Sequence, residues 1–276
     1  MPPTFSIGFS SNQTETFPEQ RLSLNDPPPN RYRTGRLIGV GVGPGDPGNL
    51  TLRAIRAIKE ADLVIAPCSS TDTEGRAESI VRNALPEVSC QRIIFDMSPG
   101  ETGTQARVRG AREAALGLHG PLCEGKTIAF VTLGDPNVFS TFSLVAKEVA
   151  HLSPETEIRT IPGIMAFQEV ASMGGLNLLD ETEKLFLVTA REGTEDLDEA
   201  LGSPNAAIVI YKGGRHLQEI KAALDMAGRL KGAVVGEMLG LEGETISDLD
   251  TVTAQRLSYL ATVIAPPLRK PEPATD

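Results

Sequence analysis

The chain has 276 residues, 40% of them hydrophobic and 22% charged, which suffices for one large folded domain or two of average size. Its formal net charge of −10 excludes a long-range field that attracts nucleic acid or an anionic membrane surface, so an anionic substrate must be bound by local arginines. No apolar run approaches the roughly 20 residues that a membrane span requires.

The first part of the chain is a polar tail followed by alternating strands and helices. Residues 1–34 are rich in Ser, Thr, Asn, Gln and Pro and lack the basic and apolar segments of a signal peptide, so we expect a disordered tail. In residues 35–154, buried apolar runs predict strands at 36–42, 63–66, 91–95 and 127–133. Helical patterns predict helices at 52–60, with Thr51 as N-cap, at 77–84, at 105–118, and from the turn at 134–136 to about 152.

The pattern restarts after Ser153 and Pro154. The strands expected beyond this point are 157–161, 185–189, 207–211, 233–237 and 260–264. One helix is entered through Pro162 and Gly163, and another covers 216–226. We therefore predict a mainly parallel α/β architecture with two domains, at 35–154 and 155–266, and a proline-marked tail at 267–276.

A glycine-rich loop follows the first strand and fits the dinucleotide-binding pattern G-x-G-x-x-G through Gly43, Gly45 and Gly48. Two features oppose that interpretation. Pro44 and Pro47 each remove an N–H donor from the loop, and no acidic residue follows the second strand to bind a ribose. The loop is therefore not expected to bind NAD.

A second pattern, GPLCEGKT at residues 120–127, matches the phosphate loop G-x-x-x-x-G-K-[ST] in full. A phosphate loop works by joining a strand to a following helix, whose N-terminal amides hold the phosphates. Here a helix precedes the loop and a strand follows it, so the loop is expected to be a polar connection only.

Glycines also mark the carboxyl ends of three later strands, in VTLGDPNVFSTFS at 131–143, TIPGIMAF at 160–167 and IVIYKGG at 208–214. Ligands of open α/β sheets bind at the carboxyl ends of strands, and glycine lets a ligand approach the main chain closely. We expect these strand ends to converge on one ligand in a cleft between the two domains.

Four of these segments together resemble the tetrapyrrole (corrin/porphyrin) methylases. They are GVGPGDP at 41–47 followed by LTL at 50–52, LGDP at 133–136, IPGI at 161–164 and YKG at 211–213, and the resemblance covers residues 36–266. Within the family, the chain is most similar to the enzymes that methylate C-20 of precorrin-2 on the route to cobalamin.

The resemblance implies a class III S-adenosylmethionine methyltransferase fold, in which two α/β domains hold the cofactor in the cleft between them. It also implies S-adenosylhomocysteine as product, a tetrapyrrole substrate and a homodimer. The cofactor-binding residues that it implies are Pro44, Leu133, Gly134, Asp135, Val138, Met165, Ala166, Tyr211, Lys212 and Leu239.

The same family chemistry suggests where the acceptor binds. We expect the loop from Gly43 through Gly45 to Gly48 to form a wall for a flat macrocycle. Asp46 either orients a pyrrole N–H or serves as a base, or it only caps the turn before Thr51. We expect cationic side chains to bind the carboxylates of the acceptor. The candidates are Arg109 and Arg112, with Arg107, Arg76 and Arg82 nearby in sequence. Alternatively, these arginines form a solvated basic stripe on the protein surface.

Three functions remain open from the sequence: methylation of precorrin-2 or its cobalt-bearing counterpart, the same chemistry on another acceptor, or a nucleotide-binding dehydrogenase or non-catalytic module. The negative net charge of the chain argues against RNA as the acceptor. The odd number of cysteines, without a C-x-x-C pair, indicates reduced thiols in a cytoplasmic protein, and the scattered histidines predict no metal site.

Overall fold

In a computed structural model of the chain, the described residues are 34–70, 72–95 and 100–269, without the side chains of 100–103. Most of the two predicted tails therefore lies outside the described residues. The two sheets of the described part belong to a single unit of contacting residues.

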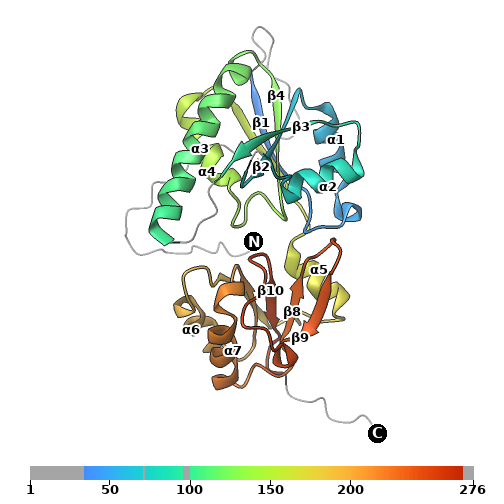
Figure 1. The fold of residues 1–276 in the computed structure, drawn as a ribbon, viewed down its shortest axis with the longest axis vertical. Helices are drawn as coiled ribbons and strands as arrows, with labels where there is room; N and C mark the ends of the chain where they lie inside the picture. Colours follow the sequence, from blue (N-terminus) through green and yellow to red (C-terminus); the bar gives the residue numbers. More distant parts are fainter. Residues whose placement is uncertain (1–33, 71, 96–99, 270–276) are drawn as a thin grey trace, which may run out of the picture. The chain divides into compact units, whose positions relative to one another are not determined.

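Strands and helices alternate in the first half, as the sequence predicts (Figure 1). The strands are β1 (Arg36–Gly41), β2 (Leu63–Cys68), β3 (Cys90–Ile94), β4 (Thr127–Thr132) and β5 (Glu157–Ile161). The helices are α1 (Leu52–Glu60), α2 (Arg76–Ala84), α3 (Gly100–Cys123) and α4 (Phe142–Leu152), and a 3-10 turn, η1 (Pro47–Asn49), precedes α1. Helix α1 has the predicted bounds, and its N-cap is confirmed because the Thr51 hydroxyl accepts a hydrogen bond from the Ala54 N–H at 3.1 Å.

The first sheet has the strand order β3-β2-β4-β1-β5, and all its pairs are parallel. Side chains alternate between its two faces, as the period of two in a strand requires. In β4, Ala129 and Val131 pack in the cluster that includes α1 and α2, whereas Ile128 and Phe130 pack with α3 and α4. Both faces are thus covered by helices, and ligands of such sheets bind at the carboxyl ends of the strands.

The second sheet has the order β6-β7-β10-β8-β9. Its strands are β6 (Lys184–Thr189), β7 (Ala206–Tyr211), β8 (Val234–Glu237), β9 (Thr245–Asp248) and β10 (Thr262–Ala265). Helix α5 (Ala166–Met173) packs on one face, and α6 (Asp198–Leu201) and α7 (Leu217–Met226) pack on the other. Short 3-10 turns are η2 (Glu195–Leu197), η3 (Gly214–His216) and η4 (Leu249–Thr251).

Three expectations need correction. Only β6 and β7 are parallel in the second sheet, and its other three pairs are antiparallel, so the mainly parallel prediction holds for the two sheets together but not for the second sheet. Strand β9 and helix α6 were not predicted. Helix α4 begins at Phe142 and not after residue 136, because the Asp135 side chain accepts from the Asn137 N–H at 2.8 Å and closes a local turn instead of a helix N-terminus.

The expected division after residue 154 also differs from the division between the sheets. Strand β5 follows that point but pairs with β1 along its whole length, from Arg36 opposite Glu157 to Val40 opposite Ile161. The chain passes from the first sheet to the second between Ile161 and Lys184. Domains with the boundaries 35–154 and 155–266 stay a prediction.

Candidate functional site

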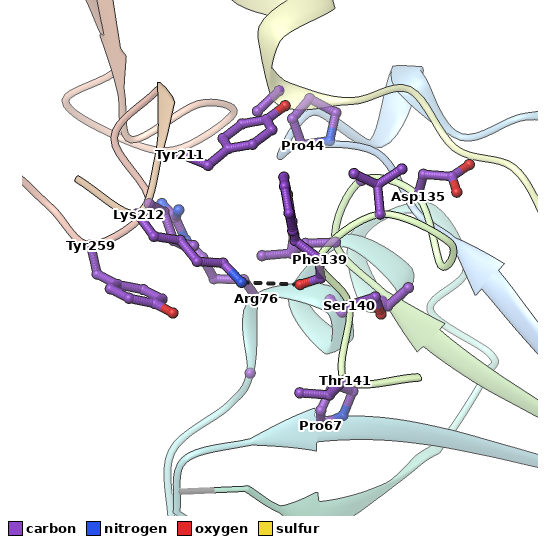
Figure 2. Close-up of a pocket in the computed structure, with 18 of the residues that line it drawn as sticks. Pro44, Pro67, Arg76, Asp135, Phe139, Ser140, Thr141, Tyr211, Lys212 and Tyr259 are labelled. Carbon is purple, nitrogen blue, oxygen red and sulfur yellow. Dashed lines mark hydrogen bonds between the residues drawn. The ribbon is translucent and has the colours of Figure 1, made fainter. Parts of the chain in front are cut away.

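A cavity of about 440 Å³ lies among the carboxyl ends of strands from both sheets (Figure 2). Its lining includes the ends of β2, β4 and β7 and the segments that follow β1, β5 and β6. Its volume is in the range of cavities that hold small ligands. This is the position predicted from the glycine-marked strand ends.

The predicted cofactor residues all line this cavity. They are Pro44, Leu133, Gly134, Asp135, Val138, Met165, Ala166, Tyr211, Lys212 and Leu239. They come from separate segments of the chain, so the fold brings the four motifs to one place.

The glycines at these strand ends are required by direct backbone contact. The Gly134 N–H donates to the carbonyl oxygen of Gly43 at 2.9 Å. A Cβ atom at Gly163 would stand 2.1 Å from the Gly134 oxygen, and one at Gly41 would stand 2.4 Å from it. No side chain fits there, so the ends of β1, β4 and β5 meet through main-chain atoms.

Asp135 holds two of the converging turns together. One carboxylate oxygen accepts from the Asn137 N–H at 2.8 Å, and the other accepts from the Gly163 N–H at 3.1 Å. Its charge is therefore used in fixing the turn after β4 against the turn after β5.

Three non-glycine residues adopt left-handed backbone conformations in or beside the cavity. Phe139 has φ 49°, Lys212 has φ 60° and Met238 has φ 53°, and Met238 precedes the lining residue Leu239. Such conformations cost of order 1 kcal/mol or more each and collect at functional sites, where they aim side chains.

An aromatic pair spans the cavity between segments of the two sheets. The rings of Phe139 and Tyr211 meet edge to face with centroids 6.2 Å apart, although 47% of Phe139 is exposed. The Tyr211 hydroxyl accepts from the Phe167 N–H at 3.1 Å, and burial raises the Tyr211 pKa to about 12. Tyr211 is therefore a neutral part of the wall at physiological pH.

Lys212 is the most perturbed cation of the cavity. Its ammonium group donates to the carbonyl oxygen of Phe139 at 3.0 Å, drawn as the dashed line in Figure 2, and lies 5.8 Å from the centre of the Phe139 ring. Burial, followed by repulsion from Arg191 and Arg107, lowers the Lys212 pKa to about 8.

The cavity is locally basic in an acidic chain. Four cationic side chains line it, from Arg76, Arg107, Arg191 and Lys212, against the carboxylates of Glu74 and Asp135. Arg76 and Arg107 were among the arginines considered from the sequence. Arg191 was missed, although it lies two residues after the end of β6, and the carboxyl ends of strands are where ligands of α/β sheets bind.

Five other predicted residues do not line the cavity. Arg109 and Arg112 are exposed on α3, which supports the alternative of a solvated stripe. Asp46 is exposed and accepts from the Gly48 N–H at 2.6 Å, as the cap of η1. This geometry supports the capping interpretation of Asp46 and gives no support to a chemical role.

Gly43 and Gly45 act through the main chain. Gly43 has φ 83° and pairs with Gly134, while a Cβ at Gly45 would stand 1.8 Å from the carbonyl oxygen of Leu239. The loop after β1 therefore supports the cavity from behind, and of this loop Pro44 lines it. The hypothesis that the loop forms a wall for the acceptor stays a prediction.

Strand β10 contributes Thr262, a polar residue, to the lining of the cavity. The Thr262 side chain is fully buried, and its hydroxyl oxygen has no hydrogen-bond partner in the structure. A buried hydroxyl without a partner costs about 1–3 kcal/mol, so a bound polar ligand group would relieve this cost.

The described residues contain no group of three or more His, Cys, Asp or Glu side chains placed to hold a metal ion. Cys68, Cys90 and Cys123 are free thiols. Among the helices of the described ranges, none combines the length and apolarity needed to cross a bilayer.

Comparisons with known proteins give a consistent result. The family described as Tetrapyrrole (Corrin/Porphyrin) Methylases matches residues 36–252. The chain is 30% identical over 240 residues to a precorrin-2 C(20)-methyltransferase of Sinorhizobium sp, covering 84% of this chain and 95% of the relative. It is 29% identical over 233 residues to a cobalt-precorrin-2 C(20)-methyltransferase of Salmonella typhimurium, covering 83% and 95%. The crystal structure of a uroporphyrin-III-C-methyltransferase from Thermus thermophilus is similar in fold, with a TM-score of 0.58 at 19% identity, covering 85% of this chain and 93% of that chain.

Proposed function

This chain belongs to the tetrapyrrole (corrin/porphyrin) methylases, and from that premise we propose that it transfers a methyl group from S-adenosylmethionine to C-20 of precorrin-2, giving precorrin-3A in cobalamin biosynthesis. The observation that carries the proposal is the cavity in which ten residues from separate strand ends converge. Similarity to two C(20)-methyltransferases over more than four fifths of the chain supports the choice of acceptor.

The cavity residues fit S-adenosylmethionine. Leu133, Val138, Met165 and Leu239 supply apolar surface for an adenine ring, and the buried Thr262 hydroxyl offers an unused hydrogen-bonding atom. The close main-chain approach at Gly134 leaves room for a ligand where a side chain would otherwise stand. When bound, the cofactor supplies a methyl group on a sulfonium sulfur.

Methyl transfer to carbon requires alignment more than a side-chain nucleophile. The residues of this chain contribute by binding both reactants, fixing their orientation and keeping water from the reacting carbon, and positioning of this kind can supply several kcal/mol of the barrier. The hydrogen bonds of Asp135 and the main-chain contacts of Gly163 keep the lining rigid, which preserves that alignment.

The acceptor of the anaerobic route, cobalt-precorrin-2, is the second candidate. The two C(20)-methyltransferases are almost equally similar to the chain, at 30% and 29% identity, and one is named for each acceptor. Both macrocycles therefore belong in the same experiment.

The decisive experiment incubates the purified protein with methyl-labelled S-adenosylmethionine and with precorrin-2 or cobalt-precorrin-2. We expect the product to gain one labelled methyl group, located at C-20 by nuclear magnetic resonance. Absence of transfer to both acceptors, or a label on another carbon, contradicts the proposal. Titration with S-adenosylhomocysteine and with NAD checks the dehydrogenase alternative, because only the former is expected to bind.

A variant of the buried hydroxyl tests the cofactor assignment. Thr262→Val removes the hydroxyl with little change of shape, and we expect affinity for S-adenosylhomocysteine to fall about 5- to 10-fold, because one hydrogen bond is lost. Thr245→Val, at an exposed position of β9, is the matched control. Equal affinity of both variants and the wild type removes Thr262 from the cofactor site.

We further propose a homodimer and a cytoplasmic location. The free thiols support a reducing compartment. Sedimentation at micromolar concentration should give twice the monomer mass, and a monomer mass at every concentration contradicts the dimer. Fractionation of the source cells tests the location.

A further inference from the structure

The cavity holds more cationic side chains than the single carboxylate of the methyl donor requires. Arg107 of α3, Arg191 after β6 and Lys212 after β7 are called here the cationic subsite. They come from three separate segments, so a single amphipathic helix does not account for them. Both arginines lie close enough to Lys212 to repel its ammonium group.

Two carboxylates, of Glu74 and Asp135, line the same cavity. Both oxygens of Asp135 accept backbone N–H bonds. Glu74 pairs with Arg82 at 2.7 Å. Arg191 and Arg107 repel the Lys212 ammonium group, and an anion bound beside Lys212 would offset that repulsion.

The charge of the donor argues against it as that anion. S-adenosylmethionine carries a sulfonium, an ammonium and one carboxylate, so its net charge is positive. A three-cation subsite repels such a molecule overall, whereas it attracts an acceptor that carries several carboxylates and no fixed positive charge. In the view of Figure 2, Phe139 lies between Lys212 and Asp135, and its exposed ring offers an apolar face beside the cations.

We infer that Arg107, Arg191 and Lys212 form a binding site for the peripheral carboxylates of the tetrapyrrole acceptor, with Phe139 as the apolar surface beside its ring. This inference rests on the proposed function for the class of acceptor and assigns the part of the site that recognises it. Arginine binds carboxylates in a two-pronged manner, and Lys212 adds a point charge whose position is fixed by its backbone conformation at φ 60°.

Lys212 gives the site a second, measurable property. With its pKa at about 8, part of Lys212 is neutral at pH 8.5, and a carboxylate bound beside it favours the charged form. Acceptor binding at pH 8.5 should therefore take up a proton. The charged or titratable side chains of the lining that share this environment are Cys68, Glu74, Arg76, Arg107, Asp135, Arg191, Tyr211 and Tyr259.

Three variants and one control test the subsite. Arg107→Gln, Arg191→Gln and Lys212→Met each remove one cation, and Arg109→Gln removes an exposed arginine of the same helix that does not line the cavity. With saturating S-adenosylmethionine, we expect the acceptor KM of each cavity variant to rise about 10- to 100-fold, the effect of one charge-assisted hydrogen bond. Arg107→Lys should recover part of the loss, and Arg109→Gln should resemble the wild type.

A binding assay keeps this test separate from the proposed function. Uroporphyrin III, an octacarboxylic macrocycle, is titrated into protein saturated with S-adenosylhomocysteine, and calorimetry in buffers of different ionisation enthalpy reports proton uptake. Weaker uroporphyrin binding in the cavity variants, with proton uptake lost in Lys212→Met, supports the subsite even where precorrin-2 is not methylated. Circular dichroism and thermal unfolding establish that each variant is folded.

Three results would overturn the inference. The first is unchanged acceptor KM and unchanged uroporphyrin affinity in folded cavity variants. The second is absence of uroporphyrin binding to the wild type. The third is a loss of S-adenosylhomocysteine affinity of tenfold or more with uroporphyrin affinity preserved, which assigns the cations to the carboxylate of the donor.

Discussion

Replacing Lys212 by Met should change how the stability of the protein depends on pH. The pKa of Lys212 falls from its ordinary value of 10.5 to about 8, with burial as the main cause. Between these values the unfolded chain holds the proton and the folded chain does not, so stability rises with pH across this window. Above pH 10.5 the penalty is absent, and below pH 8 it is fully present.

The magnitude follows from the interval of about 2.5 between the two pKa values. At about 1.4 kcal/mol per pKa unit, the upper bound is about 3.5 kcal/mol, and screening of a partly buried side chain reduces it to about 1–3 kcal/mol. The hydrogen bond to Phe139 is also lost in Lys212→Met, and this loss adds an offset. The test therefore depends on how the difference in unfolding free energy between the wild type and Lys212→Met changes with pH, and not on its absolute value.

The assay is urea unfolding of ligand-free protein at pH 7.5, 8.5, 9.5 and 10.5. We expect the free energy of unfolding of the wild type minus that of Lys212→Met to increase by about 1–3 kcal/mol from the lowest to the highest pH. Lys231→Met, at an exposed position, reports the effect of removing a solvated lysine. A difference that stays constant within about 0.5 kcal/mol would refute the argument that the cavity holds Lys212 against its charge.

Three further substitutions test the frame around the cavity. Gly163→Ala places a Cβ 2.1 Å from the Gly134 oxygen, so we expect the protein to lose about 1–3 kcal/mol of stability. Calorimetry should show at least tenfold weaker binding of S-adenosylhomocysteine. The control is Gly117→Ala, whose Cβ meets no atom within 4 Å. Asp46→Asn keeps an accepting oxygen for the turn, so kcat should stay within about threefold, and a loss of a hundredfold in folded protein would restore a chemical role for Asp46. Arg229→Met should lower the free energy of unfolding, measured in urea, by about 2–4 kcal/mol, because the buried Arg229 guanidinium donates to four carbonyl oxygens. The affinity for uroporphyrin should stay unchanged, which would confine the role of Arg229 to stability.

The inner strands β1, β2 and β4 of the first sheet could be predicted because they are mostly buried and form nearly continuous apolar runs. The edge strand β5 is only partly buried, and its alternation of apolar and polar residues was enough to predict it with its observed bounds. The sheet to which β5 belongs could not be read from the same pattern, because pairing depends on contacts distant in sequence. Strand β9 was missed for a related reason: Thr245–Asp248 is a partly exposed edge strand with little apolar signal.

The site was predicted through its backbone better than through its side chains. A glycine after a buried strand signals close main-chain approach, and the contacts at Gly41, Gly134 and Gly163 bear this out. The arginines of α3 show where sequence spacing was not used fully. Arg107 lies four residues before the buried Ala111 and so borders the buried face of the helix, whereas Arg109 is exposed.

The acidic net charge of the chain is compatible with the proposed anionic acceptor. The net charge of −10 describes the whole chain, but Arg107, Arg191 and Lys212 reach the cavity from three segments that only the fold brings together. Burial, followed by repulsion from Arg191 and Arg107, lowers the pKa of Lys212. A carboxylate bound beside Lys212 favours its charged form, so the surroundings that lower the pKa of Lys212 are also the ones expected to select an acceptor with several carboxylates.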